Sequence, residues 1–143
     1  MIQAVESPYG KIGMSICRDM SFPAYARQAG KQEVDIMLNP SFDVPKSGGA
    51  MYSLRAVENG FTMIRPVYNG YSYAVDPNGR LLAGMDSDQT ETGIMFADVP
   101  VQGTSALYSK TGDLLGWICF AGFLGFIPLN IILKRKNKKQ NAD

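Results

Sequence analysis

The pattern of apolar and polar residues begins with a short strand that turns sharply into a helix. Apolar side chains alternate with small ones over residues 12–16, which predicts a buried strand. Ser21 then supplies an N-cap and Pro23 a proline in the first turn, so a helix is expected over 22–29. Cys17 lies at the turn between the two elements, where helix N-terminal amides favour a thiolate and a nucleophile is commonly mounted.

Further strands, one helix and a hairpin follow along the chain. The expected elements are strands over 34–38, 61–67, 71–75, 80–83 and 93–99, a turn-rich loop over 39–49, and a helix over 50–59. Met51, Leu54 and Val57 recur at helical spacing, as the apolar face of a helix does. Residues 76–79, Asp-Pro-Asn-Gly, fit a type I turn, so the strand after them should pair antiparallel with the strand before them.

Residues 114–133 form an uncharged and mostly apolar run. Its length matches the roughly 20 residues that a helix needs to cross a bilayer core. The tail over 134–143 carries five basic groups and one acidic group, whereas the preceding residues carry nine and twelve. The positive-inside rule therefore predicts a transmembrane helix over 114–133, a basic cytoplasmic tail over 134–143, and an extracytoplasmic folded part before them. A buried helix of a soluble core is the alternative.

The composition narrows the chemistry that Cys17 can support. The chain has no histidine and two cysteines, which excludes Cys-His and Ser-His-Asp sites and any zinc site that needs imidazole. No metal and no cofactor are therefore expected, and a base for Cys17 must be a carboxylate or a lysine. The basic tail is too short to indicate nucleic acid and fits anionic lipid headgroups better. A buried structural cysteine is the alternative interpretation of Cys17.

Gly13 to Pro23, with the sequence GMSICRDMSFP, resembles the cysteine motif of the nitrilase, or carbon-nitrogen hydrolase, superfamily. Further segments resemble motifs of that family in the same order: 35–41 (DIMLNPS), 55–60 (RAVENG), 69–72 (NGYS) and 75–83 (VDPNGRLLA). The resemblance implies an α/β chain that forms part of a nitrilase-type αββα sandwich. It also implies a catalytic Glu-Lys-Cys set in which the glutamate and the lysine lie upstream of the cysteine.

Only Glu6 and Lys11 precede Cys17 as candidates for those two partners, and neither stands in the family's sequence context. The resemblance therefore implies that residues 1–113 are the C-terminal part of a nitrilase-like domain, and that the chain by itself is inactive. A short degenerate protein is the alternative.

The resemblance also assigns roles to individual residues of this sequence. It implies that Cys17 is the nucleophile, that the amide of Arg18 stabilises an oxyanion, and that Asp19 orients the site or an incoming amine. Asn39 and Glu58 are candidate pocket residues. For Asn39 a turn-stabilising role is the alternative, and for Glu58 a capping or ion-pairing role near the end of its helix.

Residues 107–117, LYSKTGDLLGW, resemble the junction before the last membrane helix of the apolipoprotein N-acyltransferases. That resemblance implies an enzyme of the cytoplasmic membrane, whose cysteine takes an acyl chain from a phospholipid as a thioester. The acyl chain then passes from the cysteine to the N-terminal amine of a lipoprotein. The Cys-Arg-Asp and Phe-Pro segments of this sequence are closer to the motif of the soluble amidases. A membrane-anchored amidase is therefore the alternative function. A non-catalytic remnant that binds lipid or a partner is the third alternative.

Overall fold

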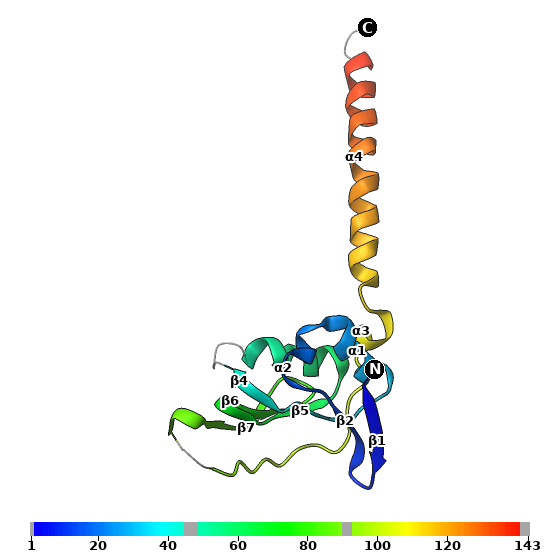
Figure 1. Ribbon diagram of the computed structural model, residues 1–143. Helices are drawn as coiled ribbons and strands as arrows, with labels where there is room; N and C mark the ends of the chain where they lie inside the picture. Colours follow the sequence, from blue (N-terminus) through cyan, green and yellow to red (C-terminus); the bar gives the residue numbers. More distant parts are fainter. Residues whose placement is uncertain (1, 45–48, 90–92, 141–143) are drawn as a thin grey trace. The chain divides into compact units, whose positions relative to one another are not determined.

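The computed structural model of the chain describes residues 2–44, 49–89 and 93–140. Two compact units make up the chain, residues 1–110 and residues 111–143. The first unit is an α/β domain built on one sheet, and the second consists chiefly of one long helix (Figure 1). The α/β class is therefore confirmed for the first unit.

A mixed sheet forms the centre of the first unit. Its strands are β1 (Gln3–Ser7), β2 (Gly10–Met14), β3 (Ile36–Leu38), β4 (Ser41–Val44), β5 (Thr62–Arg65), β6 (Val67–Val75) and β7 (Leu81–Asp86). They are ordered β1-β2-β3-β5-β6-β4, and β7 also pairs with β6. Strands β2, β3 and β5 are parallel to one another, β1 runs antiparallel to β2, and β6 runs antiparallel to β5 and β7 but parallel to β4. The carboxyl ends of β2 and β3 therefore meet at one edge, which is where open α/β sheets place their sites.

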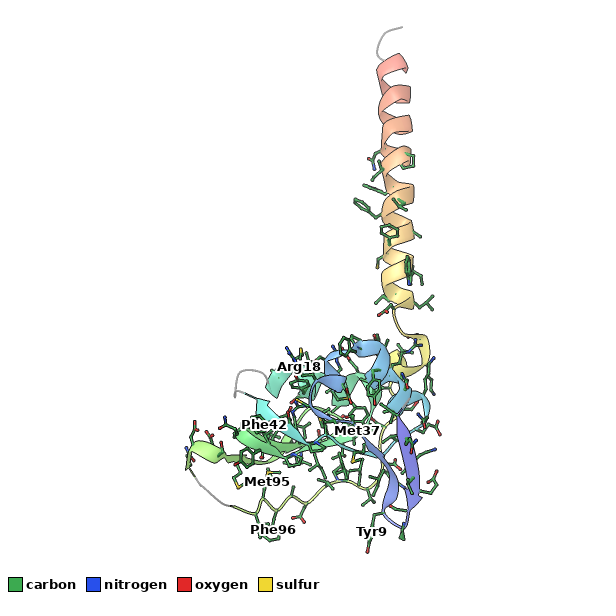
Figure 2. The ribbon with its side chains drawn as sticks, in the orientation of Figure 1. Tyr9, Arg18, Met37, Phe42, Met95 and Phe96 are labelled. Carbon is green, nitrogen blue, oxygen red and sulfur yellow. The ribbon has the colours of Figure 1, made fainter. Side chains whose placement is uncertain are left out.

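Two helices and a short 3₁₀ turn cover one face of this sheet (Figure 1). They are η1 (Cys17–Ser21), α1 (Pro23–Lys31) and α2 (Gly49–Asn59), and a second 3₁₀ turn, η3 (Ser87–Gln89), follows β7. Beneath them lies a core that includes Met37 on β3, labelled in Figure 2, together with Phe61 and Met63. Each of these three side chains is fully removed from solvent, and such burial supplies the main stabilising free energy of a domain.

The buried face of α2 differs from the face that helical spacing indicated. Met51, Leu54 and Val57 are exposed by 41% or more of their surface, whereas Tyr52 and Ala56 are buried. The predicted apolar face was therefore wrong, although the helix itself was right. The helix presents small and amphipathic residues to the sheet, because α1 and β6 approach it on that side.

The helix after Cys17 begins later than predicted. Ser21 ends the 3₁₀ turn instead of capping α1, and its hydroxyl lies 3.2 Å from that of Tyr52. Phe22 occupies the N-cap position with extended backbone, and Pro23 takes the first helical position. Residues 17–21 form a 3₁₀ turn in place of a direct strand-to-helix step, because the carboxylate of Asp19 accepts the amide of Ile16 and closes the turn.

Two other expectations differ from the structure. The loop expected over 39–49 contains β4, whose partner is the distant β6, and such long-range pairing leaves little local pattern. The strand expected over 93–99 is wrong, since these residues form no ladder in the described chain. Phe96 in this segment, which Figure 2 labels, exposes 86% of its surface.

The turn at residues 76–79 was predicted correctly. The amide of Gly79 donates to the carbonyl of Asp76 at 3.0 Å, which closes the expected turn. The carboxylate of Asp76 also accepts the amides of Asn78 and Arg80, so the antiparallel return of β7 is fixed locally.

The second unit begins within α3 (Leu107–Thr111) and continues into α4 (Leu114–Gln140). The side chains of Leu129 and of residues 131–143 lie outside the described part of the chain. Among the residues that the structure does describe, none of the helices meets the length and apolarity that a membrane crossing requires. The span expected over 114–133 is therefore not confirmed, and its last residues and the basic tail lie outside the described side chains.

Candidate active site

The backbone places Cys17 at a sharp turn between the end of β2 and the start of η1. Its amide donates to the carbonyl of Pro40 at 2.8 Å, and the amide of Ser15 donates to that of Leu38 at 3.0 Å. These bonds extend the pairing of β2 with β3 beyond the ladder itself. Cys17 then adopts a φ of 48°, a left-handed conformation that is costly for a residue with a Cβ atom.

The thiol of Cys17 is surrounded by hydrogen-bond donors. The hydroxyl of Ser41 donates to its sulfur at 3.3 Å. This bond lowers the pKa of the Cys17 thiol; burial opposes it, while the amides of Phe42 and Arg18 and the charge of Arg65 lower the pKa further. The net effect favours the thiolate, which is the nucleophilic form of cysteine.

An open apolar groove lies in front of the thiol. It has a volume of about 450 Å³ and is lined by Ile16, Cys17, Pro40, Ser41, Phe42 and Tyr68. The rings of Phe42 and Tyr68 stack with centroids 5.4 Å apart, and both side chains are largely exposed to solvent. The site therefore combines a favoured thiolate with an apolar surface.

Behind the thiol, a polar network joins the ends of β2 and β3 to β4 and β5. Asn39 donates to the hydroxyl of Ser15 at 2.8 Å and accepts a hydrogen bond from Arg65. Arg65 also donates to the carbonyl of Cys17 and to the hydroxyl of Ser41. Asn39 and Arg65 are completely buried, so the floor of the site is polar while its mouth is apolar.

The predicted site residues lie in different relations to Cys17. The backbone amide of Arg18 contributes to lowering the pKa of the Cys17 thiol, while the Arg18 side chain is exposed (Figure 2). The Asp19 carboxylate accepts the Ile16 amide at 3.0 Å and so closes the 3₁₀ turn. Asn39 lies in the floor of the site.

Glu58 forms an ion pair with Arg55 on the same helix. Arg55 in turn donates to the carbonyl of Met20 at 3.2 Å, so this pair connects α2 to η1. The geometry therefore matches the ion-pairing alternative for Glu58.

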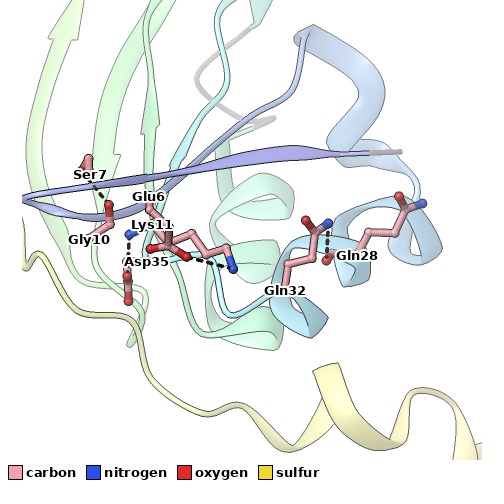
Figure 3. Close-up of polar contacts among 7 residues, drawn as sticks. All are labelled: Glu6, Ser7, Gly10, Lys11, Gln28, Gln32 and Asp35. Carbon is pink, nitrogen blue, oxygen red and sulfur yellow. Dashed lines mark hydrogen bonds and ion pairs between the residues drawn. The ribbon is translucent and has the colours of Figure 1, made fainter.

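Glu6 and Lys11, the acidic and the basic residue upstream of Cys17, interact with each other. Lys11 and Glu6 form an ion pair of 3.3 Å across the hairpin of β1 and β2 (Figure 3). The backbone amide of Lys11 also donates to the carboxylate of Asp35 at 2.7 Å. Glu6 is largely exposed, and an exposed pair of this kind contributes little stability.

Three residues of the site were not predicted from the sequence, namely Ser41, Phe42 and Arg65. Ser41 and Phe42 belong to β4, which was not predicted. Arg65 had one detectable signal, because it is a charged residue within an apolar predicted strand, and buried charges require specific partners. Among the described residues, no cluster of three His, Cys, Asp or Glu side chains could hold a metal ion.

Replacing Ser41 by alanine should raise the pKa of the Cys17 thiol, because the largest of the pKa-lowering contacts is lost. We expect slower alkylation of Cys17 by iodoacetamide at neutral pH and an unchanged rate at alkaline pH, where the thiol is ionised in both chains. The measurement uses a Cys119→Ser background, because Cys119 is the other free thiol of the chain. An unchanged pH profile would show that the Ser41 contact does not act on the thiol.

A cysteine mounted on a strand-to-helix turn of a mixed sheet, with a polar floor and a neighbouring groove, defines a domain of the nitrilase type. The chain belongs to the carbon-nitrogen hydrolase family, whose sequence model matches residues 2–108.

Curated relatives of the chain include N-acyltransferases and an amidase. The chain is 28% identical to an apolipoprotein N-acyltransferase of Shewanella oneidensis over 80% of its length and 24% of that protein. It is 34% identical to one from Rickettsia bellii over 88% of its length and 26% of that protein. Identity to a deaminated glutathione amidase of Dictyostelium discoideum is 29%, over 66% of the chain and 36% of that enzyme. The chain thus spans about a quarter of the length of these N-acyltransferases.

Solved structures support the fold. An amidase from Nesterenkonia sp. superimposes with a TM-score of 0.65 at 21% identity, over 80% of this chain and 46% of that one. A mutant of the same amidase, with the acetamide moiety of fluoroacetamide added covalently at its active site cysteine, gives a TM-score of 0.66 at 22% identity. That superposition covers 81% of this chain and 47% of the mutant.

Proposed function

We propose that this chain forms the cysteine-bearing part of an N-acyltransferase that moves an acyl chain from a phospholipid to the N-terminal amine of a lipoprotein. The observation that carries the proposal is the apolar groove that opens at the Cys17 thiol. A small polar amide has no need of such a surface, whereas an acyl chain gains free energy from each methylene that it buries, about 0.8 kcal/mol per group. The similarity to apolipoprotein N-acyltransferases points the same way.

The reaction would proceed in two displacements. A general base, the glutamate of the family's Glu-Lys-Cys set, takes the proton of the Cys17 thiol. The thiolate attacks the ester carbonyl of the phospholipid, a carbon–sulfur bond forms, the ester carbon–oxygen bond breaks, and the base returns its proton to the lysophospholipid that leaves. The amine of the lipoprotein then attacks the thioester, an amide bond forms, the carbon–sulfur bond breaks to release the thiolate, and the base accepts the proton that the amine loses. The backbone amide of Arg18 is the proposed oxyanion donor, and Asp19 the proposed residue that orients the site or the amine.

The base and the oxyanion lysine of the family's Glu-Lys-Cys set would come from residues outside this chain. Glu6 and Lys11 are engaged with each other, which makes them poor substitutes. The outer face of β2 supports this view, because Met14 at the end of this strand is 58% exposed. Large apolar side chains on a sheet face usually pack against another layer, so we place the missing half of the αββα sandwich on this face.

The proposal places the folded part outside the cytoplasmic membrane, followed by a membrane helix over 114–133 and a cytoplasmic tail over 134–143. Support comes from α4, where Trp117, Phe120 and Phe123 each expose more than half of their surface. Exposed aromatic side chains on several sides of one helix are typical of contact with lipid.

A membrane-anchored amidase is the second candidate. The Cys-Arg-Asp and Phe-Pro of residues 17–23 and the similarity to amidases support it. An amidase would release ammonia or an amine to water, whereas the acyltransferase would not. A remnant that binds lipid or a partner without catalysis is the third candidate, and it would form no thioester.

The deciding experiment uses the protein with its upstream residues, incubated with phospholipid vesicles and analysed by intact mass spectrometry. We expect a mass increase of one acyl group that maps to the peptide carrying Cys17 and disappears with hydroxylamine, which cleaves thioesters. Adding a lipoprotein N-terminal peptide should discharge the acyl group as an amide. Release of ammonia from small amides without acylation by vesicles would instead support the amidase.

A further inference from the structure

Arg65 is an arginine at the end of β5 whose side chain is completely buried. Both Nη atoms of its guanidinium donate to the carbonyl of Cys17, at 3.3 Å each. Nη2 also donates to the hydroxyl of Ser41 at 3.1 Å. A further bond reaches the side-chain oxygen of Asn39. The other side of the guanidinium lies over the ring of Tyr52, 3.7 Å from its centroid.

These partners of Arg65 are neutral oxygens and an aromatic ring instead of a carboxylate. Its Nε atom is buried and has no hydrogen-bond partner among the described residues. Burying a cation without an opposite charge costs free energy, and an apolar side chain of similar volume would avoid that cost. The arrangement is therefore expensive for stability alone, which suggests that the guanidinium serves the residues that it touches.

We propose that Arg65 is a positioning residue, which holds the carbonyl of Cys17 and the hydroxyl of Ser41 so that the turn presents the thiol to the groove. This inference rests on the proposed role of Cys17 as the nucleophile. The planar guanidinium suits the task, because its N–H groups point in fixed directions and reach two acceptors at once. A lysine in the same place offers a point charge without that geometry.

The backbone of Cys17 shows why such a clamp is needed. Its φ of 48° is left-handed, and a residue with a Cβ atom keeps such a conformation only when its surroundings enforce it. The amide of Cys17 is held by Pro40 and its carbonyl by Arg65, so both ends of the residue are fixed. Ser41 shares the same guanidinium and donates to the sulfur, which connects the clamp to the thiol.

A double-mutant cycle on thiol ionisation tests this connection. In the 143-residue chain with Cys119→Ser, the pH profile of Cys17 alkylation by iodoacetamide is measured for the parent, Ser41→Ala, Arg65→Lys and the double variant. We expect Ser41→Ala to raise the thiol pKa in the parent. In the Arg65→Lys background the rise should shrink to less than half, because Ser41 is no longer held against the sulfur. An equal rise in both backgrounds would overturn the proposal.

Arg27→Lys is the matched control, since Arg27 is also an arginine that donates to backbone carbonyls, those of Ser109 and Lys110. In that background the effect of Ser41→Ala should be fully retained, and an equal loss of the effect would overturn the proposal. Tyr52 and Tyr73 are the titratable side chains beside Arg65. Burial raises the pKa of Tyr73 to about 12, so its ionisation does not overlap the thiol profile.

If Arg65→Lys does not retain the far-UV circular dichroism spectrum of the parent, the proposal is tested by a measurement on the chain with Arg65 intact. The nitrogen NMR signals of the Arg65 Nη atoms should be resolved separately and should shift with the thiol titration of Cys17. Averaged signals that resemble those of the exposed Arg80 would contradict the clamp. Because neither readout involves acyl transfer, the protein can fail the thioester experiment while the cycle still shows coupling, and the two proposals fail separately.

Discussion

Replacing Cys17 by alanine in the protein with its upstream residues should abolish transfer of acyl chains to a lipoprotein amine. In the proposed mechanism the thiolate forms the carbon–sulfur bond of the intermediate, and Cys17 is the described groove residue whose thiol pKa is lowered by its neighbours. Losing the covalent nucleophile of an acyl-transfer enzyme lowers the rate on the order of 10⁶-fold. We therefore expect activity at the background rate of the assay, measured as amide formed on a lipoprotein N-terminal peptide.

Two controls make this result specific to Cys17. Cys119→Ser removes the other free thiol, which is exposed on α4, and should leave the rate unchanged. Cys17→Ser keeps the shape of the site but replaces the thiol with a far less acidic hydroxyl, so its activity should also be at background. If Cys17→Ala still transferred acyl chains above background, the thioester mechanism would be excluded and the cysteine would be structural.

Local chemistry made much of the fold predictable. The turn at 76–79 and the end of α2 at Asn59 depend on neighbouring residues, and each was found where the sequence indicated. The position of Cys17 between β2 and the following helical turn was predictable for the same reason. Its left-handed backbone was not, because the contacts that enforce it come from Pro40, which lies between β3 and β4, and from Arg65 on β5.

The errors arise where burial depends on distant parts of the chain. Met51, Leu54 and Val57 have the spacing of an apolar face, yet α2 buries Tyr52 and Ala56 instead. Periodicity identifies a helix, but only the packing against the sheet selects which face is inside. The same limit applies to β2, where Met14 alternates as a buried residue would and is 58% exposed.

The candidate site was predictable only in part, because it is assembled from four segments. Cys17, Arg18 and Asp19 belong to one motif that the sequence displays. Ser41 and Arg65 reach the thiol through the pairing of β4 with β6 and of β3 with β5, which no local pattern announces. The family resemblance identified Cys17 as the candidate nucleophile. The polar network behind Cys17 became visible only in the three-dimensional structure.

The largest effect on stability is expected when Gly60 is replaced by alanine. Gly60 ends α2 with a φ of 78°, and an added Cβ atom would collide with the backbone carbonyl of Thr104. A left-handed residue with a Cβ costs roughly 1–2 kcal/mol, and an overpacked site adds about 1–3 kcal/mol. Because the obstacle is backbone that also donates its amide to the Gly60 carbonyl at 2.6 Å, it cannot rotate away. We expect the free energy of unfolding to fall by about 2–5 kcal/mol.

Gly79→Ala separates the two causes. Gly79 has nearly the same φ, 80°, but its Cβ would meet only the side chain of Val57, at 3.0 Å. Val57 is partly exposed and can move, so this variant should lose only the conformational contribution of roughly 1–2 kcal/mol. Urea unfolding followed by circular dichroism, in one detergent for all chains, measures both. Equal losses would mean that segment 103–106 yields when Gly60 gains a side chain, and that the contact of Thr104 with the end of α2 contributes little to the fold.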